Sequence, residues 1–287
     1  MRRAALFLGV CCWVMAGCSD DFEEGYEPVG KEVVVTLSAS NKLHIDRSLV
    51  FFFRKYTGGD SLFYQTEVEG PTEESPTLKF ELPAGYYQMV LIGNGEENHI
   101  RSKGKSYTDM YLDYADGTEP PELYYSARVI NVGDMKITTS GVIPATVQVT
   151  LQVRQIPFQV NKIEVDLKNT GAGLYFNFEF LNIPTEPCIT KSLFPVVAGS
   201  SPEVHFNSFL TAPSGARSFL EVRCYDAENR PVYRGASETF KMGGTENISI
   251  SCTFDTKAAL FRDKDRQKMG SREKGIPNFY LVPENGH

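Results

Sequence analysis

Alternation of apolar and polar residues is the feature that most constrains how this chain folds. Residues 146–155 read TVQVTLQVRQ, and valine or leucine occupies every second position from 147 to 153. Alternate side chains share a face only in a β-strand, so this segment is expected to bury one face and expose the other. Helical periodicity is almost absent elsewhere, and we therefore predict an all-β protein.

Further runs rich in β-branched and aromatic residues lie on both sides of this segment. Clusters of Gly, Pro, Asn and Ser, which are typical of turns, separate them. Between residues 94 and 121 the pattern lapses, and we predict a short helix there at residues 107–114. The predicted strands are residues 31–39, 48–56, 62–68, 78–82, 86–93 and 123–132 in the first half, and 159–167, 174–181, 204–210, 218–225, 232–240 and 246–254 in the second.

A proline suggests where the chain divides. Pro157 cannot donate a hydrogen bond to a neighbouring strand, so it breaks the strand pattern near residue 156. We predict two tandem antiparallel β-sandwich domains, at residues 31–155 and 156–255, followed by a charged C-terminal tail at residues 256–287.

The N-terminus has the layout of a secretory signal. Arg2 and Arg3 precede an uncharged, mostly apolar segment at residues 4–16, which ends in small residues. This layout is typical of a signal peptide, here residues 1–17. As a helix, the segment would span roughly 20 Å, less than the ~30 Å hydrocarbon core of a bilayer, which disfavours a transmembrane helix.

The sequence Met15-Ala16-Gly17-Cys18 resembles the lipobox of bacterial lipoproteins. The resemblance implies that Cys18 is lipidated, with palmitate or similar acyl chains, and becomes the first residue of the mature protein. Several such chains hold a protein durably on a membrane. The alternative is an ordinary signal peptide with an incidental thiol.

Acidic residues follow Cys18 directly, within a predicted tether at residues 18–30. They resemble the short acidic tag that, in Bacteroidetes-type lipoproteins, accompanies transfer to the outer face of the outer membrane. This implies a lipid-anchored protein of the cell outer membrane, exposed at the surface; the alternative is a solvated linker. The residues of the predicted surface-export tag are Ser19, Asp20, Asp21, Glu23 and Glu24.

Composition and motifs exclude several classes of function. The net charge is -7, and no basic stripe of the kind that binds nucleic acid precedes the last thirty residues. The four histidines are scattered, and the HExxH, CxxC and GxSxG patterns do not occur. We therefore expect a non-catalytic protein without a metal site, a cofactor or a nucleic-acid partner.

Three cysteines remain after those in the signal and at the lipidation site, namely Cys188, Cys224 and Cys252. At most one disulfide can form among them. Cys224 with Cys252 is the candidate pair, because both lie in predicted strands of the same half. The alternative is three buried free thiols that behave as small apolar side chains.

The layout as a whole resembles the FimB/Mfa2 family of fimbrial anchor lipoproteins of Bacteroidetes. The resemblance extends from Cys18 to about Phe254. It rests on the lipobox, the strand at 48–53 with the Gly58-Gly59-Asp60 turn, the Leu82-Pro83-Ala84-Gly85-Tyr86-Tyr87 step into a strand that ends at Gly93-Asn94, the strand at Leu123-Tyr124-Tyr125, and the alternating pair at 147–167.

This resemblance implies a non-catalytic subunit that roots a fimbria in the outer membrane and limits its length. It also implies transthyretin-like sandwich domains and fimbrillin-type pilus subunits as partners. Such subunits join by donor-strand exchange, in which an extended segment of one subunit completes the sheet of another. In stalk subunits the first strand is released by a protease, whereas release of residues 31–39 here would cut the body from its lipid.

The C-terminal tail therefore becomes the candidate partner strand. Its apolar residues are offered to, or docked against, a partner in this interpretation; the alternative is that they complete the second domain's own sheet. The residues of this candidate strand are Ile276, Phe279, Tyr280, Leu281 and Val282.

A second function stays open from a different class, a surface glycan-binding lipoprotein that serves an outer-membrane polysaccharide uptake system. Tyr107, Tyr111 and Tyr114 would then form a platform that stacks on sugar rings. Trp13 is the only tryptophan and leaves with the signal, so the mature chain lacks the side chain best suited to sugar stacking. This favours the anchor interpretation.

Overall fold

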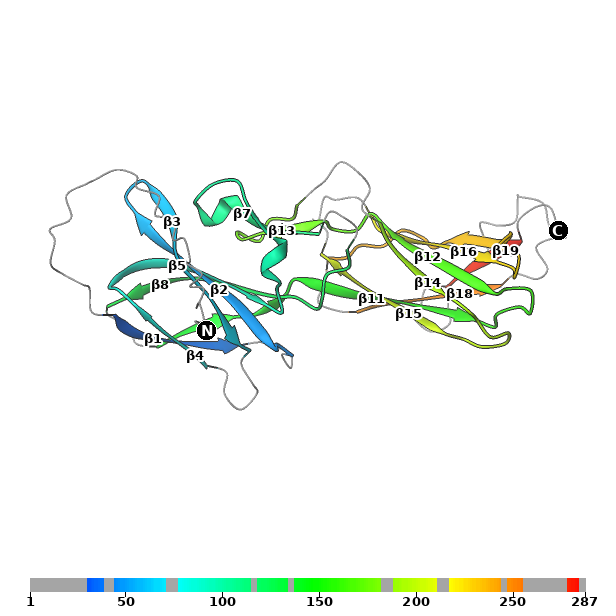
Figure 1. Ribbon diagram of the computed structural model, residues 1–287, viewed down its shortest axis with the longest axis horizontal. Coiled ribbons are helices and arrows are strands. Elements are labelled where there is room, and N and C mark those ends of the chain that lie inside the picture. The colour runs from blue at the N-terminus through cyan, green and yellow to red at the C-terminus, as the bar shows by residue number, and fades with distance from the viewer. Residues whose placement is uncertain are drawn as a thin grey trace, which may run out of the picture.

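The computed structural model describes residues 30–38, 44–70, 77–114, 118–133, 137–181, 188–210, 217–243, 247–254 and 278–283. Within them the chain forms strands and two short 3₁₀ turns, with no α-helix, which confirms the predicted all-β fold. Figure 1 shows an elongated molecule in which the two halves of the chain occupy opposite ends. None of the described helices is long and apolar enough to cross a membrane.

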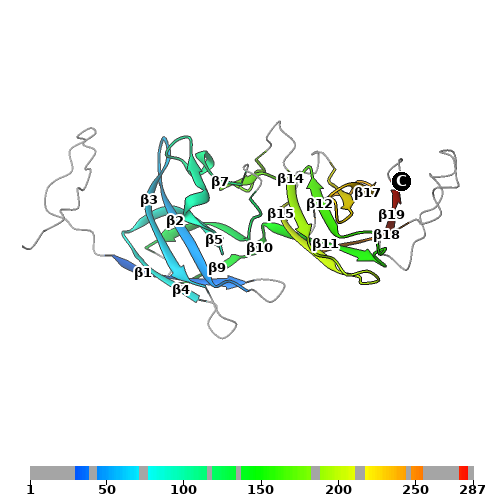
Figure 2. The same ribbon diagram turned by 45° about the vertical axis from the view of Figure 1, so that its right-hand side comes forward.

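Two sheets pack face to face in the first half of the chain (Figures 1 and 2). The smaller has the order β4 (Thr77–Leu82), β1 (Lys31–Ser38), β9 (Ile137–Gly141). The larger has the order β10 (Ile143–Pro144), β8 (Tyr124–Val132), β5 (Gly85–Gly93), β2 (Arg47–Tyr56), β3 (Gly59–Glu69). One apolar core fills the space between them, where the ring centroids of Phe52 and Phe80 lie 4.9 Å apart.

The central strands of the larger sheet are buried on both faces. In β2, Phe51, Phe52 and Phe53 are all buried, and alternate side chains enter two different cores. The second core is covered by a sheet of order β13 (Gly173–Tyr175), β7 (Met110–Asp113), β6 (Ile100–Ser102). Double burial explains why β2 and β5 contain continuous apolar runs rather than an alternation.

Residues from the second half complete this second core. The fully buried ring of Phe176 lies 4.9 Å from that of Phe51 and 6.3 Å from that of Phe53, centroid to centroid. The Tyr125 hydroxyl donates to the carbonyl oxygen of Phe176 at 2.5 Å. Side-chain packing therefore joins the two halves, in addition to the continuous chain.

The second half forms an eight-stranded sheet that closes around one core. Apolar side chains from both ends of the strand order meet there, among them Ile163, Val165, Phe206 and Ile250. The order is β14 (Cys188–Leu193), β12 (Lys162–Lys168), β16 (Phe219–Tyr225), β17 (Pro231–Ala236), β19 (Asn278–Pro283), β18 (Ile248–Phe254), β11 (Thr146–Arg154), β15 (Glu203–Phe209).

Two strands pair with partners on the other side of the predicted boundary at residue 156. A boundary at residue 156 assigns β11 to the first domain, whereas β11 pairs with β15 and β18 of the second half. Conversely, β13 lies beyond that boundary and pairs with β7 of the first half. The alternation of β11 identifies it as a strand but does not identify its partners, because both neighbours are distant in sequence.

Two sequence-based expectations differ from the structure. The predicted helix at 107–114 is a single 3₁₀ turn, η2 (Tyr107–Asp109), followed by β7. A capping box between Ser106 and Asp109 closes that turn, and Met110 and Leu112 then alternate into the core as strand residues. The sheets are also mixed rather than purely antiparallel, since β9 runs parallel to β1 and β18 runs parallel to β11.

The contact between the halves can be tested by truncating its central side chain. We expect Phe176→Ala to lower the free energy of unfolding by about 3–5 kcal/mol, because it leaves a cavity in a closed core. Urea denaturation measures the change. The matched control is Phe158→Ala, at a position that is 90% exposed, where a change within about 0.5 kcal/mol is expected. Equal effects of the two substitutions would refute this assignment.

Candidate subunit-binding site around the C-terminal strand

Several predicted site residues lie outside the described part of the chain. They are Cys18, the acidic tag at 19–24 and Ile276. The remaining candidate strand residues, Phe279 to Val282, belong to β19. The site can therefore be described around this strand.

β19 lies between β17 and β18 of its own chain. It runs parallel to β18 over four residue pairs, from Ser251–Asn278 to Phe254–Leu281. Its other edge meets β17 at only two pairs, Tyr233–Pro283 and Arg234–Val282. In this structure the segment completes the second half's own sheet, as in the alternative interpretation of the sequence; a partner role remains a proposal.

Few side chains hold β19 against the core. Phe279 and Leu281 point inward and are buried, whereas Asn278, Tyr280 and Val282 are half-buried on the other face. Each buried side chain of this size contributes roughly 1.5–3 kcal/mol. The strand is therefore held by two apolar anchors, by backbone hydrogen bonds and by the hydroxyls of Ser251 and Thr253, which donate to the Asn278 side chain.

Gly235 of β17 allows β19 to approach closely. A Cβ atom at this position would lie 2.6 Å from the carbonyl oxygen of Tyr280 and 2.9 Å from a methyl carbon of Leu281. Real Cβ atoms do not come so close to backbone atoms, so a larger residue would push β19 outward. We call the position between β17 and β18 that β19 fills the β19 slot.

The two cysteines of the candidate disulfide lie in the core beneath this slot. Cys224 of β16 and Cys252 of β18 are fully buried and, like the half-buried Cys188, are free thiols in the structure. The predicted bond is therefore not formed here. Burial raises the pKa of Cys224 to about 12 and also raises that of Cys252, which keeps both thiols protonated and unreactive.

Two loops near the slot expose large apolar side chains. Phe158 is 90% exposed, Phe194 68% and Val197 70%. The loops are tied together, since the Val196 amide donates to the Asn161 carbonyl at 3.1 Å. We call these three side chains the apolar tip. Exposed aromatic side chains such as those of Phe158 and Phe194 are enriched in protein contact surfaces.

The apolar tip lies at the end of the molecule away from the first half. β11 starts beside the first half, where the Ala145 amide donates to the Leu123 carbonyl at 2.8 Å, and then runs outward. The loop with Phe158 follows its far end. Figures 1 and 2 place the start of β1 at the opposite end of the molecule.

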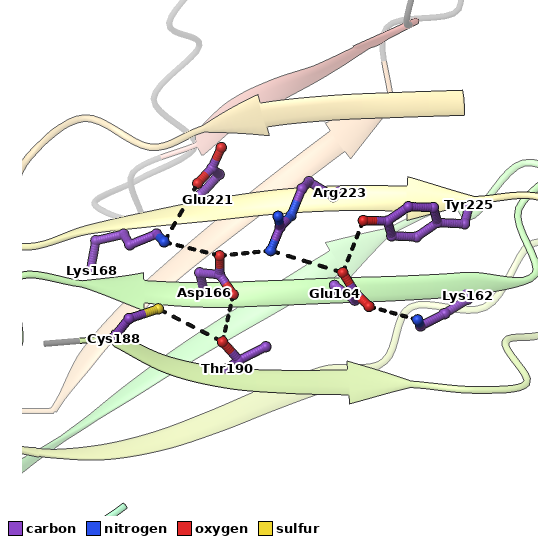
Figure 3. A network of polar contacts seen from close by, with 9 residues as sticks. All are labelled: Lys162, Glu164, Asp166, Lys168, Cys188, Thr190, Glu221, Arg223 and Tyr225. Carbon is purple, nitrogen blue, oxygen red and sulfur yellow. Dashed lines mark hydrogen bonds and ion pairs between the residues drawn. The ribbon is translucent and has the colours of Figure 1, made fainter. Parts of the chain in front are cut away.

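A charged network covers the outer face of β12, β14 and β16 (Figure 3). The buried carboxylate of Asp166 accepts a hydrogen bond from Thr190 at 2.8 Å and forms ion pairs with Arg223 at 2.8 Å and Lys168 at 3.2 Å. Glu164 pairs with the ammonium of Lys162 at 2.6 Å. The contacts of Asp166 with Thr190 and Arg223 join β12 to both of its neighbouring strands, which points to a stabilising role rather than a catalytic one.

The structure does not bring the three predicted sugar-stacking tyrosines together on the surface. Tyr114 is buried and stacks on His99 with ring centroids 3.8 Å apart. Tyr107 packs against Phe53, and Tyr111 packs against Tyr175. The predicted platform is therefore wrong, because each of the three rings packs against a different aromatic ring of the protein and not beside the other two.

Sequence reasoning missed a different group of exposed aromatic residues. Tyr56, Phe63 and Tyr86 are each more than 40% exposed, at the end of the β2–β3 hairpin and the start of β5. The guanidinium carbon of Arg54 lies 5.9 Å from the ring centroid of Tyr56 and 5.8 Å from that of Phe63. All three lie in predicted strands, and membership of a strand does not by itself tell whether a side chain is exposed.

The closeness of Gly235 to β19 gives a direct test of the slot. We expect Gly235→Ala to accelerate hydrogen exchange in residues 278–283 by about tenfold or more, because relieving such an overlap costs about 1–3 kcal/mol. Mass spectrometry of the exchanged peptides measures this. Gly243→Ala is the matched control, since no described atom lies within 4 Å of its added Cβ. Equal exchange in both variants would show that β19 does not depend on this contact.

The charged network predicts a dependence of stability on pH. The hydrogen bond from Lys162, together with Tyr225 and Arg223, holds the pKa of Glu164 below its ordinary value of 4.5. Its stabilisation is therefore fully present above pH 4.5 and is lost as the pH falls through the lower pKa of the folded state. We expect Glu164→Gln to lower stability at neutral pH by about 0.5–1.5 kcal/mol and to flatten the loss in acid. Urea titrations across this pH range test it, with the exposed Glu238→Gln as control.

Comparison with known proteins identifies the family. The family described as fimbrillin-A associated anchor proteins Mfa1 and Mfa2 matches residues 27–206. A comparison with curated protein sequences finds no match.

Solved structures share the fold at low sequence identity. The fimbrial anchor protein Mfa2 from Porphyromonas gingivalis is 16% identical with a TM-score of 0.53, over 78% of this chain and 90% of that chain. A candidate adhesin from Bacteroides thetaiotaomicron is 13% identical with a TM-score of 0.53, over 74% and 81%. A candidate polysaccharide-binding protein from the same organism is 14% identical with a TM-score of 0.52, over 71% and 79%. Because the family match covers more than half of the sequence, this chain belongs to the fimbrillin-A associated anchor protein family.

Proposed function

We propose that the protein is a non-catalytic surface lipoprotein that anchors or terminates a fimbria in the outer membrane. Family membership gives it a fimbria-associated role at the cell envelope. The observation that carries the proposal is the β19 slot beside the apolar tip, at the end of the molecule opposite to the start of β1.

In this proposal the lipid is attached at Cys18, and residues 19–30 connect it to β1. The first half then lies nearest to the membrane, and the apolar tip points away from it. Two transthyretin-like domains joined end to end would act as a spacer; the separate apolar core of each half supports this description. Fimbrillin-type pilus subunits would meet the far end.

The contact with a subunit would be made by a strand. β19 is fixed by two apolar side chains and has only two residue pairs with β17, so a strand from a fimbrillin-type subunit can compete for the slot. The displaced β19 would in turn be free to pair with the subunit. Backbone hydrogen bonds then supply affinity, and inward side chains at alternate positions supply specificity.

The alternative proposal is a glycan-binding surface lipoprotein. The observation that favours it is the group of exposed rings at Tyr56, Phe63 and Tyr86 beside Arg54. Flat aromatic faces exposed together suit stacking on sugar rings. This surface lies in the first half, so experiments on the apolar tip separate the two proposals.

Photo-crosslinking in cells tests the anchor proposal. We expect a crosslinking amino acid at Val197 to capture fimbrial subunits, because the apolar tip faces the fimbria. A crosslinker at the exposed Ile143 of the first half is the matched control and should capture none. Mass spectrometry identifies the captured proteins. Capture of transport or glycan-degrading proteins in place of fimbrial subunits would contradict the proposal.

Substitution at the apolar tip tests its contribution to affinity. We expect Phe158→Ser with Phe194→Ser to weaken retention of fimbriae on the cell about tenfold or more, since central apolar anchors typically contribute over 1 kcal/mol each. The control replaces Val129 and Ile143, two exposed apolar residues of the first half. Cys18→Ala should release the protein into the medium together with its fimbriae, whereas the tip variant should release the fimbriae alone.

A further inference from the structure

A polar pocket of about 570 Å³ lies on the outer face of the second half's sheet. This volume is within the usual range for small-ligand sites, about 300–1,000 Å³. Three adjacent strands and the loops beside them form it. Its lining residues are Gln152, Arg154, Gln155, Ser201, Thr253, Asn278 and Tyr280.

Two rows of polar residues cross the three parallel strands at the pocket, and all of them except the buried Ser251 line it. β11, β18 and β19 are in register so that Gln152, Ser251 and Asn278 form one row. The next outward-facing row is Arg154, Thr253 and Tyr280. All six side chains carry hydrogen-bonding groups on the same face of the sheet.

Hydrogen bonds within the pocket orient these groups. The hydroxyls of Ser251 and Thr253 donate to Oδ1 of Asn278 at 3.2 and 3.5 Å, which leaves the amide nitrogen of Asn278 to donate to a ligand. Nε of Arg154 donates to Oε1 of Gln152 at 3.0 Å. The amide of Gln155 donates to Oγ of Ser201 at 3.3 Å and positions the rim loop.

The lining chemistry fits a polyhydroxylated ligand. Amide and hydroxyl side chains both donate and accept hydrogen bonds, as sugar hydroxyls do, and the ring of Tyr280 adds an aromatic surface. Among the described lining residues the charged side chain is Arg154, and Glu203 of β15, which pairs with Gln152 at the edge of the pocket, is exposed. The positive charge of Arg154 and the negative charge of Glu203 lie on the same face of neighbouring strands, so a neutral sugar fits this surface better than an acidic one.

We propose that this pocket binds a neutral saccharide and that the bound saccharide holds β19 in its slot. Asn278 and Tyr280 are part of β19, whereas Gln152, Arg154 and Thr253 belong to the strands beside it. The complete pocket therefore exists only while β19 is docked. A ligand that binds only the docked state lowers the fraction of undocked β19 by a factor of 1 + [L]/Kd.

This coupling makes strand availability depend on the ligand. At a saccharide concentration of 100 times Kd, undocking of β19 is suppressed about a hundredfold. A bound glycan would thus keep the slot closed to other strands. This coupling is a property of the isolated protein and does not depend on the fimbrial role.

The test uses the purified chain without its signal segment and a panel of neutral disaccharides: maltose, cellobiose, mannobiose, galactobiose and lactose. We expect saturation-transfer NMR to detect at least one binder at millimolar concentration. With that disaccharide present, hydrogen exchange in residues 278–283 should slow in proportion to 1 + [L]/Kd. Gln152→Ala and Arg154→Ala should weaken binding about tenfold or more without removing β19.

Gln148→Ala is the matched control, because Gln148 lies on the same face of β11 as Gln152. It is closer to the first half along the strand and does not line the pocket. It should bind the disaccharide as the unaltered protein does. Absence of binding by the whole panel would overturn the proposal, and so would equal binding by the Gln152, Arg154 and Gln148 variants. Binding that leaves the exchange of β19 unchanged would refute the coupling.

Discussion

Packing of Phe176 against Phe51 and Phe53 connects the two halves of this molecule. Phe176 adds a side chain of the other half to the core on the outer face of the five-stranded sheet, and β2 therefore has apolar neighbours on both sides. A linker alone would leave the halves free to reorient. Because buried side chains hold them, the start of β1 and the apolar tip stay at opposite ends of one elongated body.

The second half combines a firmly paired side with a more weakly held one. On β12, β14 and β16, neighbouring charges satisfy each other, with Asp166 at the centre of three partners (Figure 3). β19 has two buried side chains and only two residue pairs with β17. Local stability is not uniform within a fold, and elements that exchange partners come from the less stable part. This contrast makes β19 the element most suited to respond to a subunit or a ligand.

Sequence patterns predicted most strands but not their neighbours. The alternation in β11 and β4 identified both strands because one face of each is buried. The same alternation does not specify that β11 runs parallel to β18, since the two strands are about a hundred residues apart in sequence. A parallel and an antiparallel neighbour would both bury the same face of β11. The exposure of Tyr56 and Tyr86 was also missed, because strand propensity does not tell where a sheet ends.

The sequence by itself determined the all-β class, the positions of the long strands and the candidate C-terminal strand, because these depend on local alternation and turn residues. Tertiary structure alone decided that β19 fills a slot in its own sheet, that Tyr114 is buried and that Gln152, Arg154, Asn278 and Tyr280 share one pocket. Each of these outcomes depends on contacts between residues far apart in the chain. Such contacts follow from the packing of whole sheets, which no single segment encodes.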